Sequence, residues 1–344
     1  MSAALAGAPR AHAVAGPFFE DLEVGMRVDT APAVTLTDGL AAAHRAIVGG
    51  RLRLALDAEL CRAVTGQPGL LVDPQLVCDV AIGQSTLLTQ RVIANLFYRG
   101  LAFRRLPRIG DTLRTSTEVV ALRQTSAKPG RAASGLAALR VRTFDQRDRP
   151  VLDFHRCAML PLRDPVGDTR RADDLAAVGA GTLDLRVLAA ALEGWDPQAW
   201  RGRAPAPAPG ASWCVTAGDV VSSAPELARL SLNVAAAHHD AASTGSGRRL
   251  VYGGHTIGLA AAQATRALPD LLAIVAWHGC DHLAPVYEGD TLTSRIELER
   301  AEPLGGAGGG TLLHLRSYVR ARRAHDHAAE PVEVLDWHYV AAVA

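Results

Sequence analysis

The sequence contains two copies of one unit, and this duplication restricts the possible folds more than any other feature. The segment Gly110–Leu113 (Gly-Asp-Thr-Leu) recurs as Gly289–Leu292, 179 residues later. The segment Val151–His155 recurs as Val334–His338, with Trp in place of Phe, 183 residues later. Two separate matches at nearly the same offset indicate an internal repeat, so one structural unit is expected to fold twice. The small difference in offset is consistent with a longer loop in the second copy, where Gly305–Gly310 is rich in glycine.

Each copy is predicted to contain one main helix followed by long strands. In the first copy the helix is expected to begin at Asp73-Pro74, because Asp is a favoured N-cap and Pro is favoured in the first turn. In the second copy the helix is expected from about Gly254 to Leu268, ending before Pro269. Alternating patterns predict strands near 92–103, 111–123, 135–145 and 150–160, and again near 272–282, 290–301, 311–322 and 332–342.

One helix followed by several antiparallel strands is the order of a hot-dog unit, in which a curved sheet wraps around an apolar helix. The segment Ile257–Ala262 is apolar on all sides and rich in small residues, so sheet and helix can approach closely. We therefore predict an α+β protein with a double hot-dog fold: two hot-dog units in one chain, each a curved antiparallel sheet around a central helix.

Composition excludes several classes of function. The chain has 36 Lys+Arg against 35 Asp+Glu and a net charge of +1, which argues against nucleic-acid binding and against an anionic membrane surface. No apolar run reaches the roughly 18 residues of a membrane span, and residues 1–17 do not resemble a signal peptide. The five cysteines form no CxxC motif, so neither a disulfide framework nor a metal cluster is expected and a reducing cytoplasm fits.

The two copies differ at residues that can carry chemistry. The second copy contains Asn233, His238 and Asp240 on a segment before its main helix. The offset of 183 places Gly50 opposite Asn233 and Ala55 opposite His238. Histidine is the commonest general acid or base in enzymes, so the candidate proton carrier is present only in the second copy.

The starts of the two main helices also differ, and again the group that can carry chemistry is in the second copy. The offset of 179 pairs Gln84 with Gln263 and Pro74 with Gly253. Proline has no N–H, whereas a glycine at a helix N-terminus offers an unpaired donor at the positive end of the helix dipole. Such a donor suits the oxyanion of an activated thioester carbonyl. We therefore predict one active site per chain, in the second copy.

These expectations divide the chain into four parts. The linker contains Ala204–Gly210, whose alternating prolines predict a stiff, extended segment. The predicted parts are a flexible N-terminus at 1–17, a non-catalytic N-terminal hot-dog unit at 18–162, the linker at 163–212 and a catalytic C-terminal hot-dog unit at 213–344.

From about Phe18 to Val340 the chain resembles the MaoC-like double hot-dog hydratases and dehydratases, and within them most closely the mesaconyl-CoA hydratase (β-methylmalyl-CoA dehydratase) branch. The resemblance is carried by two Gly-Asp-Thr-Leu copies together with Phe18–Asp21, Val24-Gly25, Ile93–Leu96 and Arg249–His255. In related R-specific hydratases an Asp precedes a His by five positions; here that spacing joins Asn233 to His238. An Asn can orient a water molecule, but it cannot accept a proton at neutral pH.

The resemblance implies reversible addition of water to an α,β-unsaturated acyl-CoA thioester, with a short branched dicarboxylic acyl-CoA such as mesaconyl-CoA as the expected substrate. His238 and Asn233 are then the expected catalytic residues. The expected oxyanion and substrate-binding residues are Gly253, Gly254, Tyr252, Asp240 and Arg248. The CoA belongs to the substrate, and no metal or other cofactor, nucleic acid or membrane partner is expected; a homo-oligomer of such chains is allowed.

Alternative interpretations remain open for the function and for the residues. The chain could act on another acyl thioester, including one bound to a carrier protein, or could bind acyl-CoA without catalysis. Gly253-Gly254 could be only a turn, Tyr252 a core aromatic and Arg248 a surface cation. Asp281 and His282 could be a pair that supports the site, although an ion pair at a strand end is the favoured interpretation. Ser223 and Glu226 have capping-box spacing, which predicts a helix that carries Leu227, Leu230 and Val234 inward.

Overall fold

The computed structural model describes residues 14–127, 129–130, 132–200, 202, 204–304, 309–326 and 328–344. Of the predicted flexible N-terminus at 1–17, residues 1–13 lie outside the described residues, as do residues 305–308 of the glycine-rich loop.

The chain forms two units of similar plan. The first unit contains η1 (Phe19–Asp21), β1 (Arg27–Val28), β2 (Val34–Thr35), α1 (Asp38–Val48), η2 (Arg53–Ala55), α2 (Ala58–Thr65), α3 (Pro74–Gln84), η3 (Ser85–Thr89), β3 (Ala94–Phe103), β4 (Thr112–Gln124), β5 (Ser134–Phe144) and β6 (Pro150–Pro161). The second contains β7 (Ser212–Val220), α5 (Ala224–Leu230), η5 (Ala236–His238), η6 (Ala241–Ser243), α6 (Gly253–Ala267), β8 (Leu271–His282), β9 (Thr291–Pro303), β10 (Thr311–Arg322) and β11 (Val332–Val343). The connection contains α4 (Leu185–Ala191) and η4 (Pro197–Ala199).

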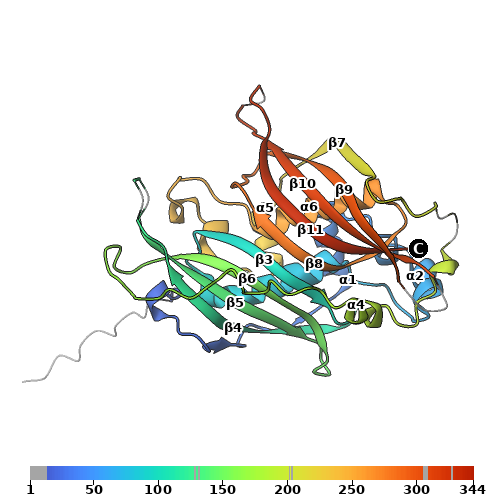
Figure 1. Cartoon of the computed structure of the whole chain (residues 1–344), viewed down its shortest axis with the longest axis horizontal. Helices are drawn as coiled ribbons and strands as arrows, with labels where there is room; N and C mark the ends of the chain where they lie inside the picture. Colours follow the sequence, from blue (N-terminus) through green and yellow to red (C-terminus); the bar gives the residue numbers. More distant parts are fainter. Residues whose placement is uncertain are drawn as a thin grey trace, which may run out of the picture.

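The strands of both units join one antiparallel sheet. Among the described residues its main order is β1-β4-β5-β6-β3-β8-β11-β10-β9-β7, with β2 beside β4. The two halves meet where β3 pairs with β8, with Phe97 opposite Asp281 and Leu101 opposite Trp277. Figure 1 shows this continuity from the strands of the first unit to those of the second. The predicted α+β double hot-dog fold is therefore confirmed.

Two apolar helices fill the hollow of the sheet and contact each other. Every residue of α3 is buried, and α6 is buried from Gly254 to Ala264. Helix α3 begins at Pro74, with the Asp73 side chain accepting from the Gln75 N–H at 2.9 Å, so the predicted helix start is confirmed. The predicted long strands agree with the observed ones to within about two residues at each end.

Matched hydrogen bonds confirm that Pro74 and Gly253 occupy equivalent positions. The Gln84 Nε2 donates to the Leu113 carbonyl at 3.2 Å, and the Gln263 Nε2 donates to the Leu292 carbonyl at 3.0 Å. Pro74 and Gly253 are each the first residue of their main helix.

The second offset is confirmed in the same way. The turn η2 in the first unit matches η5 in the second: the Ala55 N–H donates to the Leu52 carbonyl, and the His238 N–H donates to the Ala235 carbonyl, both at 3.0 Å. Ala55 therefore occupies the first-unit position that corresponds to His238.

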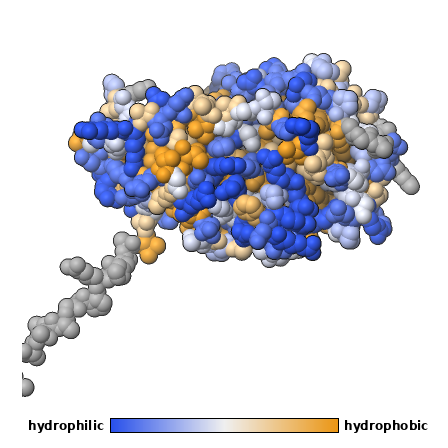
Figure 2. All heavy atoms as spheres, turned by 60° about the horizontal axis from the view of Figure 1, so that its bottom comes forward, coloured by the Kyte–Doolittle hydropathy of each residue, from blue (hydrophilic) through white to orange (hydrophobic). Residues whose placement is uncertain are grey.

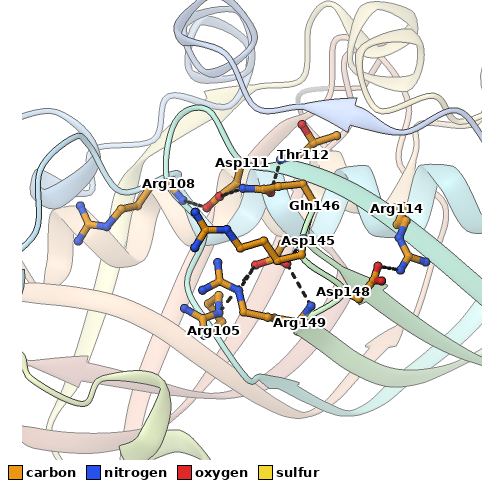
Figure 3. Close-up of polar contacts among 10 residues, drawn as sticks. Arg105, Arg108, Asp111, Thr112, Arg114, Asp145, Gln146, Asp148 and Arg149 are labelled. Atoms are coloured by element: carbon orange, nitrogen blue, oxygen red, sulfur yellow. Dashed lines mark hydrogen bonds and ion pairs between the residues drawn. The ribbon is translucent and has the colours of Figure 1, made fainter.

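The aspartate of the repeated Gly-Asp-Thr-Leu motif builds a turn in each unit. The Asp111 carboxylate accepts from the Arg108 N–H at 2.9 Å and from the Gln146 side chain at 2.8 Å (Figure 3). In the second unit the Asp290 carboxylate accepts from Arg323 at 2.7 Å. The motif thus fixes the chain before β4 and β9 and lies outside the cavity described below.

The capping box predicted at Ser223 is not formed. Ser223 has a φ of 58°, and its side chain makes no capping hydrogen bond. The Ala224 N–H donates instead to Glu288 Oε1 at 3.1 Å. Sequence spacing cannot reveal this left-handed backbone, which differs from the extended conformation usual at an N-cap.

The predicted inward stripe holds only in part. Leu227 is buried and Leu230 is half-buried, but α5 ends at Leu230 and Leu232 has a φ of 60°. Val234 therefore leaves the helical register and is 42% exposed.

The connection between the units packs on the sheet. Helix α4 contacts both β3 and β8, and Leu175 packs against Phe97 on the outer face of the first unit. Trp200 is buried, and its indole N–H donates to Asp270 Oδ1 at 2.9 Å. Residues 204–208 have no regular secondary structure, and residues 201 and 203 lie outside the described ranges.

The described part of the chain has scattered apolar surface patches, free cysteines and no helix suited to a membrane. Within the described ranges, no helix has the length and apolar character needed to cross a membrane. Hydrophilic residues separate several apolar patches on the face shown in Figure 2. All five cysteines are free, and Cys214 alone among them is exposed.

Candidate active site

A cavity of about 320 Å³ lies at the junction of the two units. The first unit contributes residues of α3, η3, β3 and β6, and the second contributes the loop before α6, the start of α6 and the end of β8. Among the predicted site residues, Asn233, His238, Tyr252 and Gly253 line this cavity. The second unit thus supplies the candidate catalytic groups while the first supplies much of the wall.

His238 is held as a neutral base. Its Nδ1 lies 2.9 Å from the Leu250 carbonyl oxygen, which can only accept, so Nδ1 carries the proton and Nε2 keeps its lone pair. The residue is 8% exposed, and burial lowers the pKa of His238 to about 4. At neutral pH the side chain can therefore accept a proton at Nε2.

Asn233 is fixed by three hydrogen bonds of its own. Its N–H donates to the Ala228 carbonyl at 2.8 Å, and its Oδ1 accepts from the Ala235 N–H at 2.9 Å. Its carbonyl accepts from His239 Nε2 at 2.6 Å, so His239 supports the segment that carries Asn233. Oδ1 has one of its two lone pairs engaged, and Nδ2 is the donor that Asn233 can offer to a molecule in the cavity.

Close approach to α3 sets the position of this segment. A Cβ added at Gly83 would lie 1.7 Å from the Ser231 carbonyl oxygen, so only glycine permits this contact. The Val234 N–H donates to Thr86 Oγ1 at 3.0 Å. The first unit therefore positions the residues of the second that line the cavity.

Gly253 offers the cavity an unpaired amide. It is the first residue of α6, and no acceptor within the described ranges pairs with its N–H. The positive end of the helix dipole lies at the same point. A Cβ at Gly253 would lie 2.6 Å from His282 Nε2, so a side chain here would enter the space between them.

Gly254 and Tyr252 have different roles. A Cβ at Gly254 would lie 2.0 Å from Asp79 Oδ1, so this glycine permits the contact between α6 and α3 rather than lining the cavity. Tyr252 is buried, and its ring centre lies 5.6 Å from that of His238. Beneath it, Asp79 Oδ2 lies 3.0 Å from His44 Nε2, and burial raises the pKa of Asp79.

The structure does not bring Asp240 and Arg248 to the cavity. Asp240 is exposed and caps η6, accepting from the Ala242 N–H at 2.9 Å. Its equivalent Asp57 caps α2 in the same way, accepting from the Leu60 N–H at 2.9 Å. Arg248 is exposed, with its guanidinium 3.7 Å from the centre of the Tyr287 ring. Neither residue lines the cavity, so their predicted roles in substrate binding stay predictions.

His282 and Arg156 also line the cavity; the sequence raised His282 only as half of a supporting pair with Asp281 and did not point to Arg156. His282 Nε2 is buried without a hydrogen-bond partner in the described part of the chain, and burial lowers the pKa of His282 to about 4. No ion pair joins Asp281 to His282 in this part of the chain, so the interpretation as a strand-end pair is wrong. The offset of 179 aligns His282 with Phe103. This replacement of an apolar residue by a histidine is the sequence signal that could have identified His282 as a site residue.

The equivalent cavity in the first unit is closed. Its volume is about 20 Å³, and it is lined by Leu52, Pro74, Phe103 and Trp277. By the two offsets these residues take the places of Ala235, Gly253, His282 and Tyr98. Larger apolar side chains thus fill one cavity, which supports a single active site per chain.

Comparison with known proteins gives full-length relatives, although no protein-family model matches the chain. The mesaconyl-CoA hydratase of Cereibacter sphaeroides is 29% identical over 350 residues, covering 96% of this chain and 98% of that protein. The β-methylmalyl-CoA dehydratase of Chloroflexus aurantiacus is 28% identical over 352 residues, covering 94% and 96%.

Two solved structures are similar over nearly their whole length. RV0216 from Mycobacterium tuberculosis, described as a conserved hypothetical protein with a double hotdog fold, is 54% identical with a TM-score of 0.85, covering 95% of this chain and 98% of that one. A MaoC domain protein dehydratase from Chloroflexus aurantiacus, named there as putative, is 25% identical with a TM-score of 0.81, covering 97% and 99%.

Proposed function

The chain belongs to the MaoC-like double hot-dog family, and on that premise we propose that it is a hydro-lyase acting on α,β-unsaturated acyl-CoA thioesters. The observation that carries the proposal is that a histidine fixed as a neutral base and an unpaired helix-terminal amide line the same cavity. A base and an oxyanion donor are the two groups that addition of water to an enoyl thioester requires.

In the direction of hydration, the Gly253 N–H donates to the thioester carbonyl oxygen. Water adds to the β-carbon, and the electron pair of the double bond moves towards the carbonyl as an enolate forms. His238 Nε2 takes the proton that the water loses and returns it to the α-carbon, so that the histidine ends neutral. Dehydration follows the same steps in reverse. Acid/base catalysis contributes roughly 100- to 10,000-fold and one oxyanion donor roughly 100- to 1,000-fold.

The names of the two curated relatives and the size of the cavity support a short branched dicarboxylic acyl-CoA, such as mesaconyl-CoA, as the substrate. A cavity of about 320 Å³ accommodates an acyl group of a few carbons. The CoA is then part of the substrate, and its nucleotide extends out of the cavity.

Purified protein mixed with mesaconyl-CoA is expected to add one molecule of water. The reaction consumes the conjugated enoyl thioester, so its ultraviolet absorbance falls and the product gains the mass of water. Butyryl-CoA, which has no double bond, is the control and should be unchanged. A chain that hydrates no member of a panel of short enoyl-CoAs, and dehydrates no 3-hydroxyacyl-CoA, would contradict the proposal.

The variant Asn233→Ala is expected to lose about 10-fold or more in kcat/KM, because the water in the cavity loses its donor. Asn233→Asp should stay closer to wild type, since it keeps the shape and the contact to the Ala235 N–H and can hold the water by accepting. A carboxylate there also raises the pKa of His238, so the acid limb of the pH profile should move upward. Steady-state kinetics over a pH series measure both effects. Equal activity of Asn233→Ala and wild type would reduce Asn233 to a structural role.

A further inference from the structure

We propose that Arg156 determines substrate specificity by binding a carboxylate on the acyl group of the substrate. The inference rests on the proposed function and names the chemical feature that the site selects. The carboxylate is the one at the end of the acyl chain remote from the thioester, so it is distinct from the phosphates of CoA.

Arg156 is a buried cation on the wall of the cavity. It lies on β6 and is 3% exposed. Its Nη2 donates to Thr89 Oγ1 at 2.7 Å and to the Ser85 carbonyl at 3.2 Å, while its Nη1 lies 3.5 Å from Asn95 Oδ1. The Nε–H is buried and has no partner in the described part of the chain. Arg156 lines the cavity, and its Nη1 makes only the long contact to Asn95 among the described residues, so Nη1 has a hydrogen left for a molecule in the cavity.

No carboxylate pairs with this cation among the described residues. Other strands of the sheet give a direct contrast: Arg140 on β5 and Arg316 on β10 each bind an aspartate through two nitrogens. A buried charge is costly unless it is paired. The Ser85 carbonyl, just after the C-terminus of α3, offsets only part of this charge because it is a neutral dipole. An arginine stays protonated at neutral pH, so the cavity wall carries a positive charge that can bind an anion.

The other titratable groups of the cavity do not neutralise Arg156. Burial holds His238 and His282 neutral at neutral pH and raises the pKa of Tyr98 and Tyr252, so neither phenol ionises. The carboxylate of Asp79 is engaged with His44 and Gln75 and does not line the cavity.

The closed cavity of the first unit provides an internal comparison. The offset of 183 aligns Arg156 with Tyr339. Tyr339 is buried and stacks on Trp337, with ring centres 3.9 Å apart. Arg156 therefore lines the open cavity, whereas the equivalent Tyr339 is an aromatic residue that does not line the closed one. A purely structural role in the hot-dog unit would not require this difference.

The location of Arg156 selects the acyl carboxylate over a phosphate. The same cavity contains His238 and Gly253, which act on the thioester end of the acyl group. The CoA phosphates lie beyond the pantetheine arm, so a ligand that places its thioester there brings its acyl chain, rather than those phosphates, into the cavity that Arg156 lines. The planar guanidinium matches a carboxylate in shape and charge.

The test compares two substrates that differ in one group. Mesaconyl-CoA carries a carboxylate where tiglyl-CoA carries a methyl group, and both carry the same CoA phosphates. Wild type is expected to prefer mesaconyl-CoA by roughly 100-fold or more in kcat/KM, as fits hydrogen bonds to a charged group. Arg156→Gln should lower kcat/KM for mesaconyl-CoA by roughly 100-fold and change that for tiglyl-CoA by less than about 3-fold. Arg140→Gln, on the next strand and outside the cavity, is the matched control and should leave the preference intact.

Arg156→Lys keeps the charge and is the second variant if Arg156→Gln does not fold, as judged by circular dichroism. It should retain a reduced preference for mesaconyl-CoA, because one point charge replaces the planar pair of donors. Loss of activity towards both substrates to the same extent in a folded variant would overturn the proposal, since Arg156 would then only hold η3. A wild type that prefers tiglyl-CoA would overturn it while leaving the hydro-lyase function standing.

A binding measurement separates the two proposals. Succinyl-CoA and butyryl-CoA are saturated, so they cannot be hydrated. Succinyl-CoA carries a carboxylate where butyryl-CoA carries a methyl group. Calorimetry should give a Kd at least about 10-fold lower for succinyl-CoA with wild type and equal Kd values with Arg156→Gln. If wild type hydrates no enoyl-CoA but shows this difference, the proposed reaction fails and carboxylate recognition stands. Equal Kd values with wild type would overturn the role of Arg156.

Discussion

Replacing His238 with alanine is expected to lower kcat/KM by about 100- to 10,000-fold while the fold is retained, because the cavity loses the group that carries the proton. His238→Gln should lose as much, although its amide can still donate to the Leu250 carbonyl; this variant removes basicity and keeps the contact. His278 is a neutral histidine outside the cavity, and His278→Gln is the matched control with near-normal turnover. Wild-type activity in a folded His238→Ala variant would remove this residue from the mechanism.

The pH profile gives a second measurement on the same residue. Burial lowers the pKa of His238 to about 4, so the neutral form that accepts a proton is present above that pH and is lost below it. In wild type, kcat/KM should therefore remain high through pH 6 and fall only as the pH approaches 4. An acid limb near 6.5, the ordinary value for histidine, would show that the imidazole titrates as in water.

The variant Gly253→Pro is expected to lower kcat by about 100- to 1,000-fold with little effect on the unfolding temperature, since it removes the oxyanion donor. The backbone accepts proline here: the position is the first of a helix, the equivalent residue is Pro74, and Tyr252 before it has a ψ of 132°. Stopped-flow or steady-state assays with a parallel melting curve measure the two effects.

The control for this variant is Gly253→Ala, because both introduce a Cβ that would lie 2.6 Å from His282 Nε2. Alanine keeps the N–H, so the loss of activity in Gly253→Ala measures the effect of displacing His282 alone. Activity of Gly253→Ala well above that of Gly253→Pro assigns the difference to the amide. Equal activities would make the glycine a spacer for His282 rather than a donor.

Local patterns explain why most of the fold was predictable. Asp73-Pro74 is a start signal that acts within one turn, and the strands follow alternations of apolar and polar residues. The repeat then supplied the architecture, because two equal units in one chain can bury their open edges against each other. The pairing of β3 with β8 is the physical result.

The site was predictable only where the repeat offered a comparison. Asn233, His238 and Gly253 stood out because their equivalents lack the same chemistry, and the structure brings all three to one cavity. Arg248 is predicted as a group that binds the CoA phosphates or a substrate carboxylate, and it is exposed and does not line the cavity. With 35 arginines in the chain, nothing local distinguishes Arg156, whose burial depends on contacts between β6, η3 and β3.

The closed cavity of the first unit has a consequence for how such a chain can change. In a homodimer of a single hot-dog unit, one gene encodes both cavities, so every substitution appears in each of them. Fusion gives the two cavities separate codons, and Phe103 and Pro74 can fill one without obstructing the other. One cavity is thereby close-packed, while the other keeps unpaired polar groups such as those of Arg156 and His282.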